Sequence, residues 1–221
     1  MTLVFRDTPS PNFNDRKCPL ACIVLHYTGM ETGAAALERM CDPQAQVSAH
    51  YMVEEDGTVC RLVDEAHRAW HAGVSFWRGE RDLNSASIGI EIVNGGHDLG
   101  LPGFPAVQIA AVIALVRDVM GRHGIAPREV IGHSDIAPGR KIDPGEKFPW
   151  AQLAEAGCAL KLPQAHVAGE PDALLERIGY GLQPGLPAVI EAFQRRWRPA
   201  RVDGQLDDET RDLIARVASA A

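Results

Sequence analysis

The chain has 221 residues, of which 46% are apolar and 23% are charged, a composition typical of a globular protein with one sizeable core. Its formal net charge of −7 and the lack of a basic run exclude a nucleic-acid binder that depends on phosphate contacts. No stretch of about 18 apolar residues occurs, so no membrane span is predicted.

The cysteines bear on the compartment in which the protein works. There are five, scattered and without a CxxC pair: Cys18, Cys22, Cys41, Cys60 and Cys158. An odd, scattered set favours reduced thiols over a disulfide framework. The first residues also lack the basic segment and apolar core of a secretory signal. We therefore expect a cytoplasmic protein, with the periplasm as the alternative.

Strands and helices alternate in the first half of the chain. The predicted elements are a turn-rich lead-in over 10–16, a strand over 20–26, a short helix over 32–40 and a hairpin over 49–63. The run 20–26 is almost continuously apolar, which is typical of a central strand covered on both faces. The hairpin prediction rests on the Asp56-Gly57 turn between two apolar runs.

The second half continues the alternation. An irregular region over 69–85 precedes a strand over 87–93, a helix over 105–123, a strand over 129–131 and a helix over 149–156. In the strand, Ile88, Ile90 and Ile92 alternate with Gly89 and Glu91. The longest helix is predicted from apolar residues at helical spacing: Ile109, Val112, Ile113, Val116 and Met120.

Interleaved strands and helices indicate an α/β fold with a mixed central β-sheet flanked by helices, over residues 1–160. Residues 161–171 are typical of a linker, and residues 172–221 predict a small C-terminal three-helix domain. Its helices are expected near 172–178, 186–197 and 207–217. Because about fifty residues make a marginal core, we expect this bundle to dock on the first domain.

The stretch 131–145 is the most informative in the chain. A short apolar run delivers His133 at its end, and a loop rich in Pro and Gly returns Asp143 ten residues later. An imidazole and a carboxylate on a stiff loop suit a metal such as zinc. The alternative is that His133 caps a turn and that Asp143 forms an Asx-turn before Pro144.

A third candidate ligand, His26, ends another predicted central strand. If the two strands are neighbours, two imidazoles and a carboxylate converge at one sheet edge and leave a fourth zinc position open, as in catalytic sites. Cys22 is a conceivable ligand on the same strand face, although a packing role is typical of free cysteine. His26 could equally be a core histidine with satisfied hydrogen bonds.

Two charged residues could complete a hydrolytic site. Glu91 lies in an otherwise apolar strand, and a buried carboxylate is costly unless it has a partner or a task. It is a candidate general base, whereas the structural alternative pairs it with Arg68 or Arg78. Lys141, two residues before Asp143, could stabilise an oxyanion.

Five motifs together resemble the zinc-dependent N-acetylmuramoyl-L-alanine amidases of the AmpD/AmiD type, which share their fold with peptidoglycan recognition proteins. The motifs span residues 23–28, 47–51, 69–73, 87–94 and 132–145, and the likeness covers about residues 8–158. The resemblance implies one zinc on His26, His133 and Asp143, with Glu91 as catalytic carboxylate and Lys141 stabilising the transition state. The implied reaction hydrolyses the amide between N-acetylmuramic acid and the L-alanine of a stem peptide.

The same resemblance suggests residues that line a substrate groove: Tyr27, Trp70, His71 and Asn94. Packing around the site is an equal alternative for them, and His50 is expected to be structural. Residues 190–197 and 201–210 are similar to a three-helix peptidoglycan-binding domain. The expected partner is a muropeptide or peptidoglycan, in recycling or remodelling. A non-catalytic recognition protein, a zinc peptidase for another amide and a periplasmic hydrolase of the intact polymer stay open.

Overall fold

The computed structural model describes residues 2–221, and its centre is a six-stranded mixed sheet in the order β1-β5-β4-β7-β3-β8. The strands are β1 (Phe5–Asp7), β3 (Cys22–Tyr27), β4 (Tyr51–Val53), β5 (Val59–Arg61), β7 (Ser87–Ile92) and β8 (Val130–Gly132). β7 and β8 both pair parallel to β3, while β4 and β5 form the predicted antiparallel hairpin. The predicted α/β class with a mixed central sheet is confirmed.

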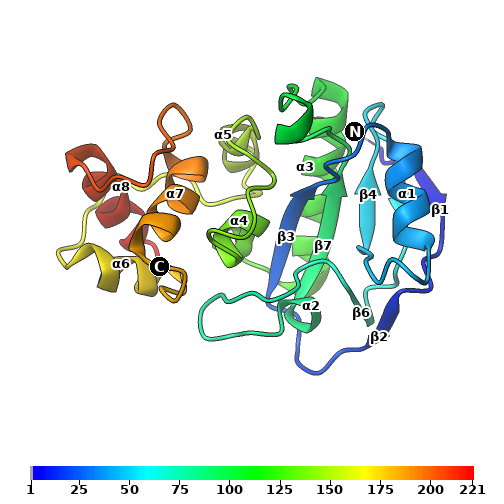
Figure 1. The fold of residues 1–221 in the computed structure, drawn as a ribbon, viewed down its shortest axis with the longest axis horizontal. Helices are drawn as coiled ribbons and strands as arrows, with labels where there is room; N and C mark the ends of the chain where they lie inside the picture. The colour runs from blue at the N-terminus through cyan, green and yellow to red at the C-terminus, as the bar shows by residue number, and fades with distance from the viewer. Residues whose placement is uncertain (1) are drawn as a thin grey trace.

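The two longest strands lie next to each other in the middle of the sheet (Figure 1). The alternating residues Ile88, Ile90 and Ile92 of β7 pack in one hydrophobic cluster with Ile109 and Val112. Residues on the opposite face of β7 are therefore not part of this hydrophobic cluster and can line a functional site. That face carries Gly89 and Glu91.

Helices cover the sheet on both sides (Figure 1). The longest, α3 (Ala106–His123), supplies the apolar face predicted from its spacing and ends at Gly124 in the left-handed conformation. α1 (Gly33–Cys41) begins after Thr32, whose side chain accepts a hydrogen bond from the backbone N–H of Ala35. The short elements are α2 (Leu83–Ala86), η1 (His97–Leu99), η2 (Pro127–Glu129), α4 (His133–Ile136) and α5 (Trp150–Glu155).

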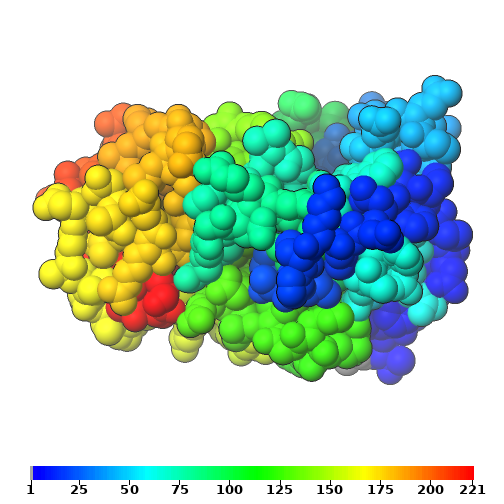
Figure 2. All heavy atoms as spheres, turned by 90° about the horizontal axis from the view of Figure 1, so that it is seen from below, coloured from blue at the N-terminus to red at the C-terminus, as the bar shows by residue number. Residues whose placement is uncertain are grey.

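Three helices follow in the C-terminal segment: α6 (Pro171–Ile178), α7 (Leu186–Trp197) and α8 (Asp208–Ala218). Their apolar residues, such as Phe193 and Ile214, share one hydrophobic cluster with Trp77, Ile131 and Ile136 of the first part. Figure 2 shows the same closeness on the surface, where the yellow to red C-terminal atoms adjoin the segment around residues 70–85. The helices therefore dock as expected, whereas the predicted division at 161–171 stays a prediction.

The structure differs from the prediction in two places. A two-stranded antiparallel sheet joins β2 (Phe13–Asp15) to β6 (His67–Ala69), within the expected turn-rich lead-in and at the edge of the expected irregular region. The expected rigid loop after β8 instead begins with the single helical turn α4. All five cysteines carry free thiols. Within residues 2–221, no helix combines the length and the apolar character needed to cross a membrane.

Candidate metal centre and active site

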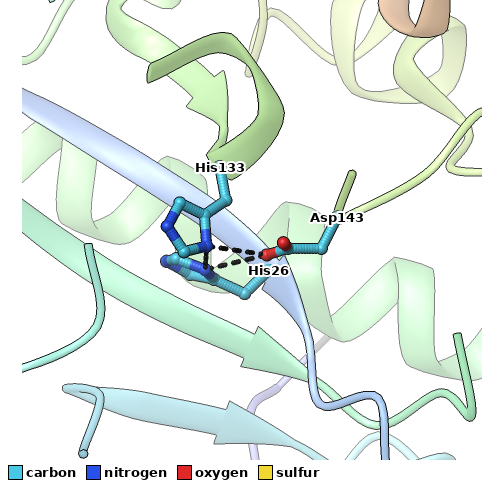
Figure 3. A group of neighbouring side chains, drawn as sticks. All are labelled: His26, His133 and Asp143. Atoms are coloured by element: carbon cyan, nitrogen blue, oxygen red, sulfur yellow. Dashed lines mark hydrogen bonds and ion pairs between the residues drawn. The ribbon is translucent and has the colours of Figure 1, made fainter. Parts of the chain in front are cut away.

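Three predicted ligands meet at the carboxyl ends of neighbouring strands (Figure 3). His26 is the penultimate residue of β3, and His133 directly follows β8, which pairs parallel to β3. The Nδ1 atoms of the two imidazoles lie 2.9 Å apart, and Oδ2 of Asp143 lies 3.0 Å from the first and 3.1 Å from the second. The side chains are almost wholly buried, with His26 only 1% exposed.

Local backbone contacts fix the spacing of the second and third ligands. The N–H of Ser134, next to His133, donates to the backbone carbonyl of Asp143 at 2.9 Å, which closes the segment between them. Gly132 allows this close approach, because a Cβ there would lie 2.9 Å from Cδ of Pro144. The ten-residue spacing in the sequence thus becomes a direct contact between two chain segments.

Hydrogen bonds determine which nitrogen of His133 is free. Its Nε2 lies 3.1 Å from the carbonyl oxygen of Ala72. A carbonyl only accepts, so Nε2 carries the proton and Nδ1 presents a lone pair toward Asp143. An outer hydrogen bond of this kind is the usual way of orienting a metal-binding histidine.

A chain of hydrogen bonds determines the tautomer of His26 as well. The Ser87 hydroxyl donates to the carbonyl of Leu83 and therefore accepts from Nε2 of His71, 3.3 Å away. Nδ1 of His71 is then the acceptor for Nε2 of His26 at 3.0 Å. This leaves Nδ1 of His26 with a lone pair. Gly89 makes room for the chain, since a Cβ there would lie 2.5 Å from the His71 ring.

Two imidazole lone pairs and a carboxylate oxygen consequently face one another within 3.1 Å, an arrangement that is repulsive unless a cation lies between them. Burial, followed by the electrostatic influence of the adjacent His133 imidazole, lowers the pKa of His26 to about 4. Burial alone would raise the pKa of Asp143, but its contacts with the His133 and His26 imidazoles outweigh burial and hold the pKa well below its ordinary value. Both groups are thus unprotonated at neutral pH, and two imidazoles with one carboxylate suit zinc with an open fourth position.

Glu91 lies beside the three candidate ligands. It is the Cα partner of His26 in the parallel pair β3–β7, so both side chains point to the same face. Its Oε2 is buried without a hydrogen-bond partner among residues 2–221. Burial and the charge of Asp143 raise its pKa well above the ordinary value, and Lys141 opposes that rise.

The predicted alternative for Glu91 was wrong. Arg68 pairs with Asp82 at 2.9 Å, and Arg78 pairs with Glu129 at 3.2 Å. Neither arginine is therefore the partner of the Glu91 carboxylate. The Glu91 side chain is half-buried, and its carboxylate lies next to the candidate metal ligands without a partner among residues 2–221. A carboxylate in this position is typical of a functional group rather than of a structural ion pair.

A cavity of about 430 Å³ opens above these residues. Its wall includes all three candidate ligands and Glu91, together with the predicted residues Lys141, Tyr27, Trp70 and His71. Asn94 is not in the wall. Its side chain donates to the carbonyl of Pro102 and accepts from the N–H of Gly96, each at 2.9 Å, so both ends of the amide are bound within the segment after β7 and the expected substrate contact stays a prediction.

Cys22 and His50, the two other residues considered near the candidate metal ligands, have structural roles. Cys22 packs in the hydrophobic cluster shared with the C-terminal helices and does not reach the cavity. His50 is fully buried, and its Nδ1 accepts from the backbone N–H of Gly89 at 2.9 Å. It therefore supports β7 beneath the site, as expected.

The cavity wall also contains three residues that were not predicted from the sequence: Arg39, Asp98 and Arg140. The one feature of the sequence that could have indicated Arg140 is its position next to Lys141. In the structure Arg140 donates to the Ala72 carbonyl at 2.7 Å, and the same oxygen orients His133. A second series of hydrogen bonds beside the cavity was also not predicted. Tyr27 donates to Nδ1 of His97, whose Nε2 donates to Glu146, both at 2.9 Å.

Comparisons with known proteins agree with this geometry. Residues 16–146 match the N-acetylmuramoyl-L-alanine amidase family. The chain is 37% identical to N-acetylmuramoyl-L-alanine amidase AmiD of Escherichia coli (strain K12), over 86% of this chain and 79% of AmiD. It is 34% identical to 1,6-anhydro-N-acetylmuramyl-L-alanine amidase AmpD of the same strain, over 67% of this chain and 89% of AmpD.

Two solved structures resemble the whole fold. One is the complex of E. coli AmiD with the substrate anhydro-N-acetylmuramic acid-L-Ala-D-γ-Glu-L-Lys, with a TM-score of 0.81, 35% identity and coverage of 91% of this chain and 89% of that one. The other is Pseudomonas aeruginosa AmpDh3 in complex with anhydromuramic pentapeptide, with a TM-score of 0.81, 33% identity and coverage of 91% and 92%. Both matches extend well beyond residues 16–146.

Proposed function

The chain belongs to the N-acetylmuramoyl-L-alanine amidase family and is an amide hydrolase, and we propose that it works with one zinc ion held by His26, His133 and Asp143. The observation that carries the proposal is the pair of imidazoles whose outer hydrogen bonds turn both Nδ1 lone pairs toward one carboxylate oxygen. The bond to be cleaved joins N-acetylmuramic acid, or its anhydro form, to the L-alanine of a stem peptide.

The residues around the metal divide the chemistry between them. When bound, zinc supplies Lewis acidity to the scissile carbonyl and to the attacking water. Glu91, unpaired and beside the ligands, takes a proton from that water and passes it to the leaving nitrogen. Lys141 faces the same cavity and stabilises the negative charge that develops on the carbonyl oxygen. Tyr27 and Trp70 provide ring faces for the sugar or the peptide.

For the substrate we propose a soluble anhydro-muropeptide. Support comes from the two similar structures, which hold an anhydro-N-acetylmuramic acid peptide and an anhydromuramic pentapeptide. A cytoplasmic location goes with this substrate and stays a prediction, with the five free thiols as its support. The alternative of a non-catalytic recognition protein does not account for the unpaired carboxylate of Glu91 beside the three ligands.

The test is mass spectrometry of the products from anhydro-N-acetylmuramic acid-L-Ala-D-γ-Glu-L-Lys and from intact sacculi. We expect release of the free peptide from the soluble compound, loss of that release after removal of zinc, and its return when zinc is added. Cleavage at any bond other than the one to L-alanine would contradict the proposed reaction. Faster release from sacculi than from the soluble fragment would contradict only the proposed substrate.

A further inference from the structure

Asp135 is a buried carboxylate that belongs to the segment carrying His133. It is 1% exposed and lies two residues beyond the candidate ligand, within the same helical turn α4. Its Oδ2 accepts from the backbone N–H of Gly132 at 2.8 Å, immediately before His133. The carboxylate therefore ties together the two ends of the backbone turn on which the ligand is mounted.

The other two partners of Asp135 come from the C-terminal segment. The hydroxyl of Tyr180 donates to Oδ1 at 2.6 Å, and Nη1 of Arg196 donates to Oδ2 at 3.1 Å. Nη2 of the same guanidinium donates to the carbonyl of Val130 at 3.1 Å. Arg196 therefore binds both strand β8, which precedes His133, and the helical turn α4, which carries it. These contacts join residues 45 and 61 positions apart in the sequence.

The network is buried and leaves Asp135 little freedom to move. Tyr180 is 1% exposed and Arg196 is 8% exposed, with the guanidinium 4.1 Å from the ring centre of Trp150 and 4.9 Å from that of Trp197. A carboxylate that accepts three hydrogen bonds in such surroundings is held firmly, because losing any donor leaves a buried acceptor site without its hydrogen bond. Packing alone would not require these polar groups inside the interface.

We propose that the C-terminal helices hold the metal ligand His133 in position through Asp135, so that Tyr180 and Arg196 are positioning residues of the metal centre. The inference rests on the metal site proposed above. A site of this kind requires its ligands within about 0.5 Å of the productive geometry. Outer partners of metal ligands are worth about 10–100-fold in metal affinity. Tyr180 and Arg196 act one step further out, through the backbone, so the lower end of that range applies.

Zinc release from the full-length protein to a chromophoric chelator tests the inference. Tyr180→Phe removes one hydroxyl and keeps the ring that packs against Trp77 and Phe193. We expect it to weaken zinc binding about tenfold and to change the absorption spectrum of the Co²⁺-substituted protein. The matched control is Ile214→Val, which loosens the same hydrophobic cluster from α8 without touching Asp135. It should lower the denaturation midpoint and leave zinc release unchanged.

A second variant, Arg196→Met, and the double variant Tyr180→Phe/Arg196→Met extend the test. Since both residues act on one carboxylate, the effect of the double variant on zinc affinity should differ from the sum of the single effects. Equal zinc release from Tyr180→Phe, Ile214→Val and the original protein would overturn the inference and leave the contacts purely structural. Lack of stoichiometric zinc in the original protein would instead overturn the metal site itself.

Discussion

His26 and Glu91 are Cα partners in the parallel strands β3 and β7, which places an imidazole and an unpaired carboxylate side by side on one face of the sheet. The two neighbouring strands therefore contribute different functional groups: β3 supplies a candidate metal ligand, and β7 supplies the candidate base. The opposite face of β7 is filled by isoleucines that pack against α3. The base therefore stands on a rigid element rather than on a loop.

The first prediction concerns that carboxylate. Glu91→Gln keeps the shape of the side chain and removes its basicity, so kcat should fall by about 10²–10⁴-fold while zinc content stays at one per chain. The matched control is Glu155→Gln on the exposed side of α5, which should retain full activity. Kinetics of peptide release combined with elemental analysis measures both quantities. Wild-type turnover in Glu91→Gln would move the base to another residue.

The second prediction concerns the hydrogen-bond chain behind His26. Ser87→Ala removes the acceptor for Nε2 of His71, so the proton on His26 is no longer fixed at Nε2. We expect zinc affinity to fall about tenfold, as is typical of outer partners of a ligand. Ser75→Ala, which removes a hydroxyl that donates to the Gly73 carbonyl, is the control. Nitrogen-15 NMR of the histidines reports the tautomers directly, and unchanged tautomers with unchanged affinity would contradict the chain.

The third prediction is a pH profile. Glu91 must be deprotonated to act as a base, so activity is lost as the pH falls through its pKa. Lys141 lowers that pKa, and its removal in Lys141→Met should shift the acid limb of the profile to higher pH. The same change should reduce kcat by about 10²-fold through weaker oxyanion stabilisation. Lys141→Arg keeps the charge and should keep the acid limb in place. An unshifted acid limb in Lys141→Met would show that Lys141 does not influence the pKa of Glu91.

The fourth prediction links His50 to stability. Burial, with the charge of Arg16, lowers the pKa of His50 from 6.5 to about 3. Between these pH values the unfolded chain binds the proton and the folded chain does not, so the free energy of unfolding should fall as the pH falls through this window. The loss attributable to this group is on the order of a few kcal/mol. Urea denaturation at several pH values should show a flatter dependence for His50→Gln, and an equally steep one would assign the effect elsewhere.

Much of the fold was predictable because its signals are local. β3, β7 and α3 are long enough for their apolar patterns to decide strand or helix without help from the rest of the chain. The pair β2–β6 was not predictable in this way. Both strands have three residues, and all those of β2 are exposed, so no pattern distinguishes them from turns.

In the candidate site, too, the residues marked by a local sequence pattern were predictable, and those whose role depends on distant parts of the chain were not. The three candidate metal ligands were predictable, because polar residues at the ends of central strands converge at one edge of the sheet. Asn94 satisfies the same rule but bonds its own turn, a choice that depends on the path of residues 95–102. The partnership of Asp135 with Tyr180 and Arg196 was beyond the sequence, because it depends on how the C-terminal helices dock.

The last prediction concerns the C-terminal segment as a whole. Truncation after Leu162 removes Tyr180 and Arg196 and uncovers the apolar surface around Ile131 and Ile136. Burying a large apolar side chain is worth about 1.5–3 kcal/mol, so we expect a loss of several kcal/mol in stability or outright aggregation. Zinc release should accelerate in any truncated protein that stays folded, because Asp135 loses two of its three donors. Chemical denaturation, chelator kinetics and co-sedimentation with sacculi distinguish the outcomes. A truncated chain with full stability and full zinc retention, but without the sacculus binding of the intact protein, would show that the segment is a wall-binding module and not a support for the metal site.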